Sequence, residues 1–475
     1  MSTITIMDPV TRIEGHLKVE VQIDPVGGEN QIIDARCTGT LFRGFETILL
    51  GRDPKDAPVI TQRICGVCPV SHGMASTLAL ESAVAQKPPA NARILRNLVL
   101  GSNYLQSHIL HFYLLAALDY VKGPQTSPWI PAWEGDLKAT PLDGIIVERL
   151  GQAVEARKRA HEMGAIFGGR MPLPHATVPG GFTATPSSSR ISAFLGQLNW
   201  LTNFIESTYI PDVNALAAVY PEYKSIGAGS RNLLAFGVFN LSDTTAAKLF
   251  KRGYVLDAST TVNALNTGKI TEHVAHSWYA DATNKLKPAA GLTEPLYPKD
   301  GAYSWLKAPR YDGKPFEAGP LARMWVNGDY REGVSVMDRH NARALEALKV
   351  AKAMSGWLQQ LKTGNPVYSD YLEPVSGDGI GLTEAPRGAL GHWVSIANGK
   401  LAHYQVITPT CWNASPQDTR HIPGPMEKAL IGTPVADPQR PIEALRVIHS
   451  FDPCLSCAVH VMRPLKKPIV IKARS

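Results

Sequence analysis

Apolar residues recur at three- and four-residue steps along four long stretches of the chain, and polar residues fill the positions between them. This spacing places the apolar side chains on one face of an α-helix. It therefore predicts four long helices, over residues 91–121, 145–167, 188–218 and 335–362.

Strict alternation of apolar and polar residues marks a smaller number of strands. Residues 17–24, LKVEVQID, alternate in this way, and residues 32–40 follow a glycine pair as the expected partner strand. Residues 392–407 contain two alternating runs around Asn398 and Gly399, and Asn-Gly is a strong signal for a two-residue hairpin turn.

Pro- and Gly-rich passages such as residues 168–181 separate the helices. They are too short and too apolar for disordered linkers, so we expect ordered loops against the core. A length of 475 residues would allow two to four domain-sized units, but the pattern contains no internal repeat or low-complexity tract. The predicted fold is mainly α (multihelical α+β), with a large helical body and small peripheral β-sheets.

Residues 97–118 form the longest stretch without Lys, Arg, Asp or Glu, and 22 residues could span a bilayer. Five polar side chains in this stretch would be costly in hydrocarbon, whereas a helix inside a large protein can give them partners. They are Asn97, Asn103, Gln106, His108 and His111. We therefore predict a central core helix and no transmembrane segment.

The charge balance argues against a nucleic-acid partner. Lys and Arg number 48 against 41 Asp and Glu, and no basic run is interleaved with aromatic residues. The start of the chain shows no basic region followed by an apolar one, which predicts no signal peptide of its own and synthesis in the cytoplasm.

The chain has six cysteines, and four of them form two CxxC pairs near opposite ends. Cys37 and Cys411 are isolated, and we interpret them as small buried apolar residues. Two CxxC pairs brought together would present four soft thiolates at one point, which suits a metal ion. The pairs are Cys65 with Cys68 and Cys454 with Cys457.

Spacing alone leaves more than one role for these pairs. So few cysteines in a cytoplasmic product do not resemble a disulfide scaffold. Structural zinc usually joins cysteines within a few tens of residues, whereas Cys68 and Cys454 are 386 positions apart. Structural zinc and a catalytic metal both remain open at this point.

The residues around the pairs resemble the large subunit of nickel-iron hydrogenases along the length of the chain. Two passages, SNYLQSHILHFY and GPLARMWV, resemble the branch that includes the selenium-containing enzymes, and Cys454 stands where that branch has selenocysteine. The motifs that carry the resemblance are RICGVCPVSH (63–72), DPCLSCAVH (452–460), DPVTRIEGH (8–16), RGFE (43–46) and EAPRG (384–388).

The resemblance implies a nickel-iron centre that splits dihydrogen. Such a reaction needs a soft metal and a base within reach, because dihydrogen is nonpolar and a very weak acid. By resemblance, all four cysteines bind nickel, and Cys68 and Cys457 also bridge to an iron that carries carbon monoxide and two cyanides. Cys65 and Cys454 are then terminal nickel ligands. Cys454 is the first proton acceptor, and Glu14 takes the proton on its way out.

The resemblance also implies a polar lining for the diatomic ligands. Arg387 would donate to one cyanide and polarise bound hydrogen, and Thr410 would donate to the other cyanide. His72 would donate toward a bridging thiolate, and Asp452 would support Arg387. Many members have an aspartate where this chain has Ser107, so we expect the support of Arg387 to differ here.

A second metal, magnesium or in some members iron, is implied near the C-terminus. Its ligands would be Glu46, His460, a backbone carbonyl at about Val406, and waters. Without the resemblance, Glu14 and Glu46 would be interpreted as ion-pairing carboxylates, with Arg43 or Arg52 beside Glu46, and Asp452 as a turn residue.

Electrons must leave through another chain. A four-iron cluster normally takes four cysteines, and only Cys37 and Cys411 remain outside the two pairs. The resemblance implies an iron-sulfur small subunit, which normally carries the export signal for both chains. The complex is therefore expected to be periplasmic or membrane-associated.

The resemblance further implies processing at the C-terminus. A maturation protease would cut between His460 and Val461 after nickel-insertion proteins have acted, leaving residues 1–460 as a single domain. The extension, residues 461–475, contains five basic residues and no acidic one, so it should stay solvated. The predicted function is reversible cleavage of dihydrogen; the alternative is a zinc-clasped structural or scaffold protein related to respiratory-complex subunits, which have typically lost the cysteine pairs.

Overall fold

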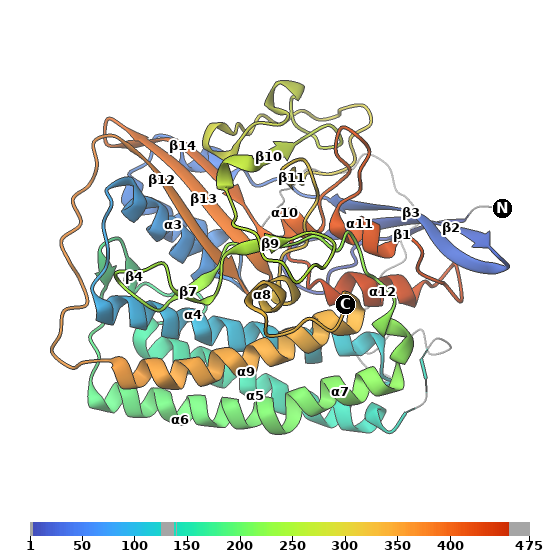
Figure 1. The fold of residues 1–475 in the computed structure, drawn as a ribbon, viewed down its shortest axis with the longest axis horizontal. Helices are drawn as coiled ribbons and strands as arrows, with labels where there is room; N and C mark the ends of the chain where they lie inside the picture. Colours follow the sequence, from blue (N-terminus) through green and yellow to red (C-terminus); the bar gives the residue numbers. More distant parts are fainter. Residues whose placement is uncertain (1–2, 125–136, 139, 456–475) are drawn as a thin grey trace.

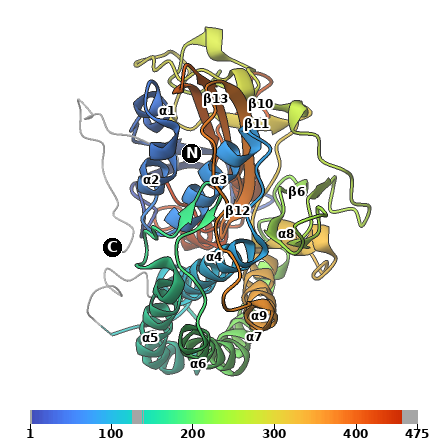
Figure 2. The same cartoon turned by 90° about the vertical axis from the view of Figure 1, so that its left-hand side faces the viewer.

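The computed structural model describes residues 3–124, 137–138 and 140–455. A layer of long helices forms one side of the molecule, and a three-stranded sheet lies over it (Figure 1). Figure 2 shows the same helices from their ends, stacked beneath the sheet. The helices of this layer are α4 (Ala90–Leu110), α5 (Leu142–Gly168), α6 (Ser188–Phe204), α7 (Ile210–Val219) and α9 (Val336–Gln360).

The four predicted long helices are confirmed, with interruptions that the pattern did not show. Residues 188–218 form α6 and α7 joined by a π-helical segment, Ile205–Tyr209. Serines cap two of the helices: Ser187 accepts a hydrogen bond from the Arg190 amide, and Ser335 accepts one from the Asp338 amide. After Leu110, α4 continues as a π-helical segment, His111–Ala116, and a short 3₁₀ turn, Ala117–Asp119.

Helix α4 is buried along almost its whole length, as the core-helix prediction requires. The Asn97 side chain donates to the Asn240 carbonyl at 2.8 Å, and the Asn103 and Gln106 amides both donate to the Val67 carbonyl. His108 contacts Glu346, and His111 donates to the His449 carbonyl. The polar side chains of the stretch thus have protein partners, and no helix among the described residues is long and apolar enough to cross a membrane.

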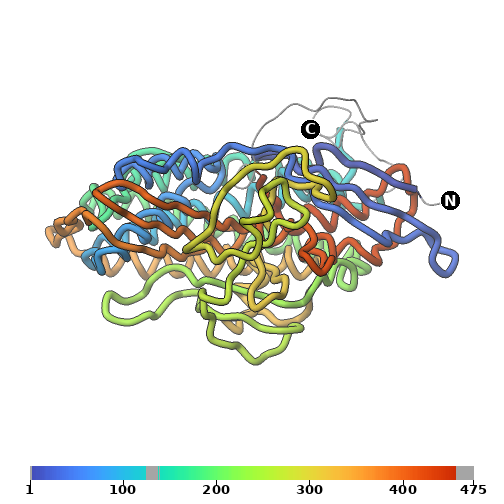
Figure 3. The backbone as a smooth tube through the Cα atoms, turned by 90° about the horizontal axis from the view of Figure 1, so that it is seen from above, coloured from blue at the N-terminus to red at the C-terminus, as the bar shows by residue number. Residues whose placement is uncertain are grey.

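The predicted N-terminal strands and C-terminal hairpin are also confirmed. Strands β1 (Thr3–Met7), β2 (Leu17–Val26) and β3 (Glu29–Gly39) form an antiparallel sheet in that order. This sheet projects from one end of the molecule (Figure 3). Strands β13 (Gly388–Ala397) and β14 (Lys400–Ile407) are joined by Asn398 and Gly399, both with positive φ, as a tight hairpin turn requires.

The sequence pattern did not predict β12 (Gly377–Ala385), which pairs with β13, or α3 (Pro69–Ala83), which packs across β12. A Cβ on Gly379 or Gly381 would lie 2.0 or 1.8 Å from a carbonyl oxygen of α3, so only glycine allows this close approach. Glycine also weakens the strand signal, which explains why β12 was missed.

Shorter elements connect these layers. The passage at residues 168–181 is ordered, as expected, and enters the ladder of β4 (Thr177–Val178) and β5 (Gly181–Phe182). The other ladders pair β6 (Leu233–Ala235) with β9 (Gly253–Val255), β7 (Val238–Asn240) with β8 (Lys248–Phe250), and β10 (Ile270–His273) with β11 (Ala308–Tyr311). The short helices are α1 (Phe45–Leu49), α2 (Ala57–Thr61), α8 (Pro320–Asn327), α10 (Pro409–Asn413), α11 (Pro425–Leu430) and α12 (Ile442–Ser450).

Candidate metal centre

Three cysteine sulfurs from opposite ends of the chain meet in the interior. The Sγ atoms of Cys65, Cys68 and Cys454 all lie within 4.8 Å of one another, and the three side chains are buried. Cys65 follows a 3₁₀ turn, Cys68 caps the N-terminus of α3, and Cys454 lies shortly after α12. The folding of the whole chain is therefore needed to form the cluster.

The spacing of the sulfurs fits a metal site. The Cys65 sulfur lies 2.9 Å from that of Cys68 and 3.4 Å from that of Cys454, whereas a disulfide would need about 2.05 Å. The amides of Val67 and Cys68 donate to the Cys65 sulfur at 3.3 and 3.1 Å, which fixes the position of this sulfur. Such a soft, buried donor set suits nickel, and the predicted fourth ligand, Cys457, lies outside the described residues.

Arg387 lies beside the cluster and is fully buried. Its Nε donates to the Asp452 carbonyl at 3.0 Å, and its Nη2 lies 2.9 Å from Asp452 Oδ1. Burial alone would lower the pKa of Arg387, but the charges of Asp452, Cys454 and Cys68 raise it well above its usual value. The guanidinium therefore stays charged, with Ser107 Oγ at 3.5 Å from Nη1.

One N–H group of Arg387 has no aligned acceptor. Although Nη2 is close to Asp452, the geometry does not make a hydrogen bond, and within the described part of the chain Nη2 is a buried donor without an acceptor. The donor role predicted for Arg387 stays a prediction. Thr410 Oγ1 accepts from the Cys454 amide at 3.1 Å, so its own proton can point elsewhere.

Glu14 lies on the backbone of the first CxxC turn. Its Oε2 accepts from the Gly66 amide at 3.0 Å, and its carbonyl accepts from the Leu455 amide at 2.7 Å. A Cβ on Gly66 would lie 2.4 Å from Glu14 Oε1, so a larger residue here would displace the carboxylate from its present position. Glu14 thus contacts both cysteine-bearing segments, the first through its carboxylate and the second through its backbone carbonyl.

His72 begins a buried row of hydrogen-bonding groups. Its Nδ1 lies 3.2 Å from Nε2 of His392, and Nδ1 of His392 lies 2.8 Å from the hydroxyl of Tyr404, which donates to Ser76. Burial, with a smaller contribution from Arg43, lowers the pKa of His72 to about 3, so the ring is neutral. Its other nitrogen, Nε2, has no partner among the described residues, and its predicted donation to a thiolate stays a prediction.

Glu46 faces a small cavity of about 50 Å³. Its Oε1 accepts from the Val406 amide at 3.0 Å, and Oε2 accepts from the Thr293 hydroxyl. The predicted ligand from Val406 is its carbonyl, and the predicted ligand His460 lies outside the described residues. Of the two arginines considered as ion-pair partners for Glu46, Arg43 donates to the Ile64 and Arg63 carbonyls and Arg52 donates to the Ile48 carbonyl.

Sequence reasoning missed three residues around this cavity. Glu272 and Lys307 line it with Glu46, and Gln405 donates to Glu272 Oε2 at 2.7 Å. Burial raises the pKa of Glu272 to about 7, and Glu46 adds to this while Lys307 opposes it. Two carboxylates facing one small cavity fit a hydrated cation, but their isolated positions in the sequence gave no signal.

A buried ion network holds the loop that carries Arg387. Arg323, on α8, binds Glu346 at 2.6 Å and Glu384 at 2.8 Å. It also donates to the carbonyls of Ala385 and Pro386 at 3.0 and 2.7 Å. The ion pair with Arg323 and a hydrogen bond from His108 overcome burial and hold the pKa of Glu346 at about 2. These contacts hold the EAPRG segment in place.

The two isolated cysteines lie apart from the centre. Cys37 is fully buried in the core, as predicted, and burial raises the pKa of its thiol. Cys411 is half-buried and accepts a hydrogen bond from the Thr408 hydroxyl at 3.3 Å.

Comparisons with known proteins show the family to which the chain is related. A family model described as nickel-dependent hydrogenase matches residues 43–127 and 124–460, and one described as HoxL-like matches residues 3–37. The chain is 41% identical to the periplasmic NiFeSe hydrogenase large subunit of Desulfomicrobium baculatum, over 96% of this chain and 94% of that protein. It is 33% identical to the uptake hydrogenase large subunit of Bradyrhizobium diazoefficiens, over 97% and 95%.

Solved structures share the fold. The NiFeSe hydrogenase of D. vulgaris Hildenborough in its reduced state superposes with a TM-score of 0.92 at 42% identity, covering 97% of this chain and 100% of that one. A structure from D. baculatum gives a TM-score of 0.93 at 40% identity, with 97% and 100% covered. The mainly helical fold with small sheets is thus confirmed.

Proposed function

The chain belongs to the family of nickel-dependent hydrogenase large subunits, and we propose that it reversibly cleaves dihydrogen to protons and electrons at a nickel-iron centre. The convergence of Cys65, Cys68 and Cys454 in one buried cluster is the observation that carries this proposal. Cys457 would complete the ligand set, with Cys68 and Cys457 shared between nickel and iron. Such an enzyme is an oxidoreductase.

Side chains of the protein would accept and transfer the proton. When bound, the nickel-iron centre supplies the soft, electron-rich site at which dihydrogen is polarised. Cys454 would accept the proton as a terminal thiolate, because its sulfur lies in the cluster. Glu14 would take the proton next. Its carboxylate accepts a hydrogen bond from the Gly66 amide, and its backbone carbonyl accepts one from the Leu455 amide.

Other side chains would orient the diatomic ligands on iron, which we propose to be one carbon monoxide and two cyanides. Arg387 offers a buried, charged donor whose Nη2 lacks an aligned acceptor in the described residues. Thr410 offers a hydroxyl toward the second cyanide, and Asp452 holds Arg387 through its carbonyl and carboxylate. His72 is placed to contact a bridging thiolate.

We also propose a magnesium or iron ion in the cavity of Glu46. The ion would take Glu46, the Val406 carbonyl, His460 and waters as ligands. Glu272 and Lys307 line the same cavity and would hydrogen-bond to those waters.

Membership of the family implies an iron-sulfur small subunit as the partner that receives the electrons. We propose that a maturation protease and nickel-insertion proteins act on the chain beforehand. Cleavage between His460 and Val461 would remove residues 461–475, whose five basic residues would otherwise stay solvated, and leave 1–460 as one domain.

A relative of this chain is named a periplasmic hydrogenase, and another a quinone-reactive one. We propose that this chain is made in the cytoplasm and exported with its small subunit, to work in the periplasm or at the membrane. The alternative of a zinc-clasped structural protein has no support among the relatives, which are named as hydrogenases.

Metal analysis of the purified, mature complex tests the proposed function. We expect nickel and iron in the large subunit, with infrared bands from carbon monoxide and cyanide. The matched control is Cys37→Ala, which removes a buried cysteine outside the cluster and should keep nickel and bands alike. Zinc in place of nickel, with no such bands, would exclude a hydrogenase.

Intact mass spectrometry of the active, nickel-loaded enzyme tests the processing. We expect a large subunit that ends at His460. A fully active chain that still ends at Ser475 would disprove cleavage without affecting the proposed reaction.

A further inference from the structure

A cavity of about 540 Å³ opens between α3, α4, strand β12 and the segment from β7 to β9. Its lining shares no residue with the cysteine cluster or with the cavity of Glu46. The volume is in the range of small-molecule sites. The hydrogen reaction gives this cavity no role.

The lining has an excess of positive charge. Asp243 is its single carboxylate, against five cationic side chains. The cationic residues are Lys87, Arg93, Arg96, Lys248 and Arg252. Such a lining would concentrate anions from solution.

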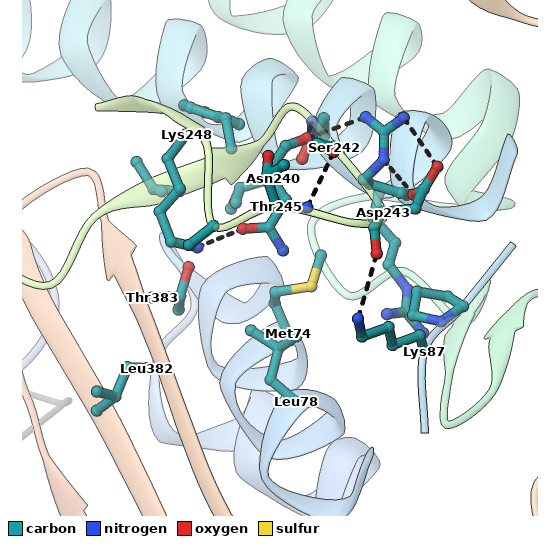
Figure 4. A pocket seen from close by; sticks show the side chains of 18 of the residues that line it. Met74, Leu78, Lys87, Asn240, Ser242, Asp243, Thr245, Lys248, Leu382 and Thr383 are labelled. Atoms are coloured by element: carbon teal, nitrogen blue, oxygen red, sulfur yellow. Dashed lines mark hydrogen bonds and ion pairs between the residues drawn. The ribbon is translucent and has the colours of Figure 1, made fainter. Parts of the chain in front are cut away.

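Two of the five cations are neutralised within the protein. Arg93 binds Asp243 at 2.5 Å, and Arg96 forms a two-pronged ion pair with Glu81 at 2.7 and 3.0 Å. Lys87 donates to the Asp243 carbonyl at 3.4 Å (Figure 4). The remaining pair, Lys248 and Arg252, is different.

Lys248 and Arg252 have no carboxylate partner among the described residues. The ammonium group of Lys248 donates to the Asn240 side-chain oxygen, and Arg252 Nε donates to the Phe236 carbonyl at 2.9 Å. Burial, and then the charge of Arg252, lower the pKa of Lys248 to about 8. Lys248 is half-buried and Arg252 is exposed, and their remaining N–H groups are available to bind an anion.

The opposite wall is apolar. In Figure 4, Lys248 and Asn240 lie on one side, and Met74, Leu78 and Leu382 lie on the other. An inorganic ion would use the cations but leave this wall facing water. A ligand with one anionic group and an apolar body matches both sides.

We infer that this cavity binds a small organic anion, whose carboxylate or phosphate group lies between Lys248 and Arg252 and whose apolar part packs against Met74, Leu78 and Leu382. The cations fix the position of the charged end, and the apolar wall selects against inorganic ions. The site is separate from the hydrogen chemistry, so occupancy does not depend on nickel.

Calorimetric titration of the mature complex tests the site with octanoate, its neutral counterpart octanamide, and inorganic phosphate as probes. We expect saturable binding of one octanoate per large subunit, with octanamide and phosphate at least tenfold weaker. Octanamide as tight as octanoate would overturn the ionic part of the inference, and phosphate as tight as octanoate would overturn the apolar part.

Three variants assign the binding to the cavity. Lys248→Met keeps the aliphatic stem and removes the charge, and Arg252→Gln removes the second charge; each should weaken octanoate at least tenfold. The matched control, Lys251→Met, removes an exposed charge from the same segment outside the lining and should change nothing. Unchanged affinity in both cavity variants, or an equal loss in the control, would overturn the inference. Normal hydrogen oxidation in all three variants verifies that they are folded.

Discussion

Two buried charged groups, Arg323 and Arg387, lie near each other in the chain's interior and differ in how fully they are paired. Arg323 binds two carboxylates and two backbone carbonyls at 2.6 to 3.0 Å. Arg387 has one carboxylate partner, Asp452, and an Nη2 donor that lacks an aligned acceptor within the described residues.

The difference separates a structural role from a chemical one. A buried charge whose donors are all satisfied stabilises the positions of the groups around it, and has nothing left to offer a ligand. A buried donor that makes no aligned hydrogen bond is available to a ligand. Arg323 therefore holds the EAPRG segment, and Arg387 presents its guanidinium to the centre. Substitution of Arg323 should therefore lower stability, and substitution of Arg387 should lower turnover.

The largest effect should come from Cys454→Ala. The change removes a metal ligand and the proposed proton acceptor together, so both nickel and hydrogen oxidation should be lost. Elemental analysis and a hydrogen-oxidation assay measure the two. Nickel retained at full occupancy would show that Cys454 is not a ligand.

Glu14→Gln should lower turnover about 100- to 10,000-fold, the range for removing a group that transfers a proton. The amide keeps the shape and can still accept from Gly66, so nickel and the infrared bands should stay as in the wild type. Glu20→Gln on β2 is the control. Full turnover in Glu14→Gln would remove this residue from the proton path.

Arg323→Met should destabilise the protein by about 3–5 kcal/mol, because it leaves Glu346 and Glu384 buried without their cation. Lys352→Met, which breaks an exposed ion pair with Glu206, should cost less than about 1 kcal/mol. Denaturant unfolding measures both. Equal costs would mean that the Arg323 network is not structural.

Arg387→Lys should lower turnover about 100- to 1,000-fold while nickel is retained. Lysine keeps the charge but loses the planar fork, so it cannot hold Asp452 and donate to a ligand at once. The cyanide infrared bands should shift, a change that a purely structural role would not produce. Arg190→Lys, at an exposed position on α6, should leave the bands unshifted.

Gly66→Ala should give the smallest loss, about tenfold in turnover. The added Cβ would lie 2.4 Å from Glu14 Oε1 and must push the carboxylate from its place. The same change made in Glu14→Gln should cost almost nothing further, because the two act through one step. If the losses in turnover of the two variants were additive, Gly66→Ala would not act through Glu14.

The sequence predicted the features that local pattern or motif controls. The long helices and the hairpin at Asn398 and Gly399 follow from periodicity and turn chemistry, and two CxxC pairs pointed to a metal. Strand β12 was missed because its glycines serve contact with α3, a tertiary demand that lowers local propensity.

The partners of the centre were harder to predict than its ligands. Glu272 stands in the short strand β10, far in sequence from Glu46, and nothing around it in the sequence shows that the two carboxylates line one cavity. Glu346 lies within a helical pattern, where a buried glutamate is indistinguishable from an exposed one until α8 brings Arg323 against it. Such pairings depend on the complete fold.

The contact between Cys65 and Cys454 spans 389 positions, and it sets a limit on when the centre can exist. Because Cys454 is made 389 residues after Cys65, a growing chain holds Cys65 and Cys68 without the third sulfur of the cluster for most of that interval. Helices α4, α5, α6 and α9 lie between Cys68 and Cys454 in the sequence and can pack first, because their contacts are closer in sequence. A chain released before Cys454 would contain these helices but not the complete cluster, so an assembled cluster reports that translation has passed Cys454.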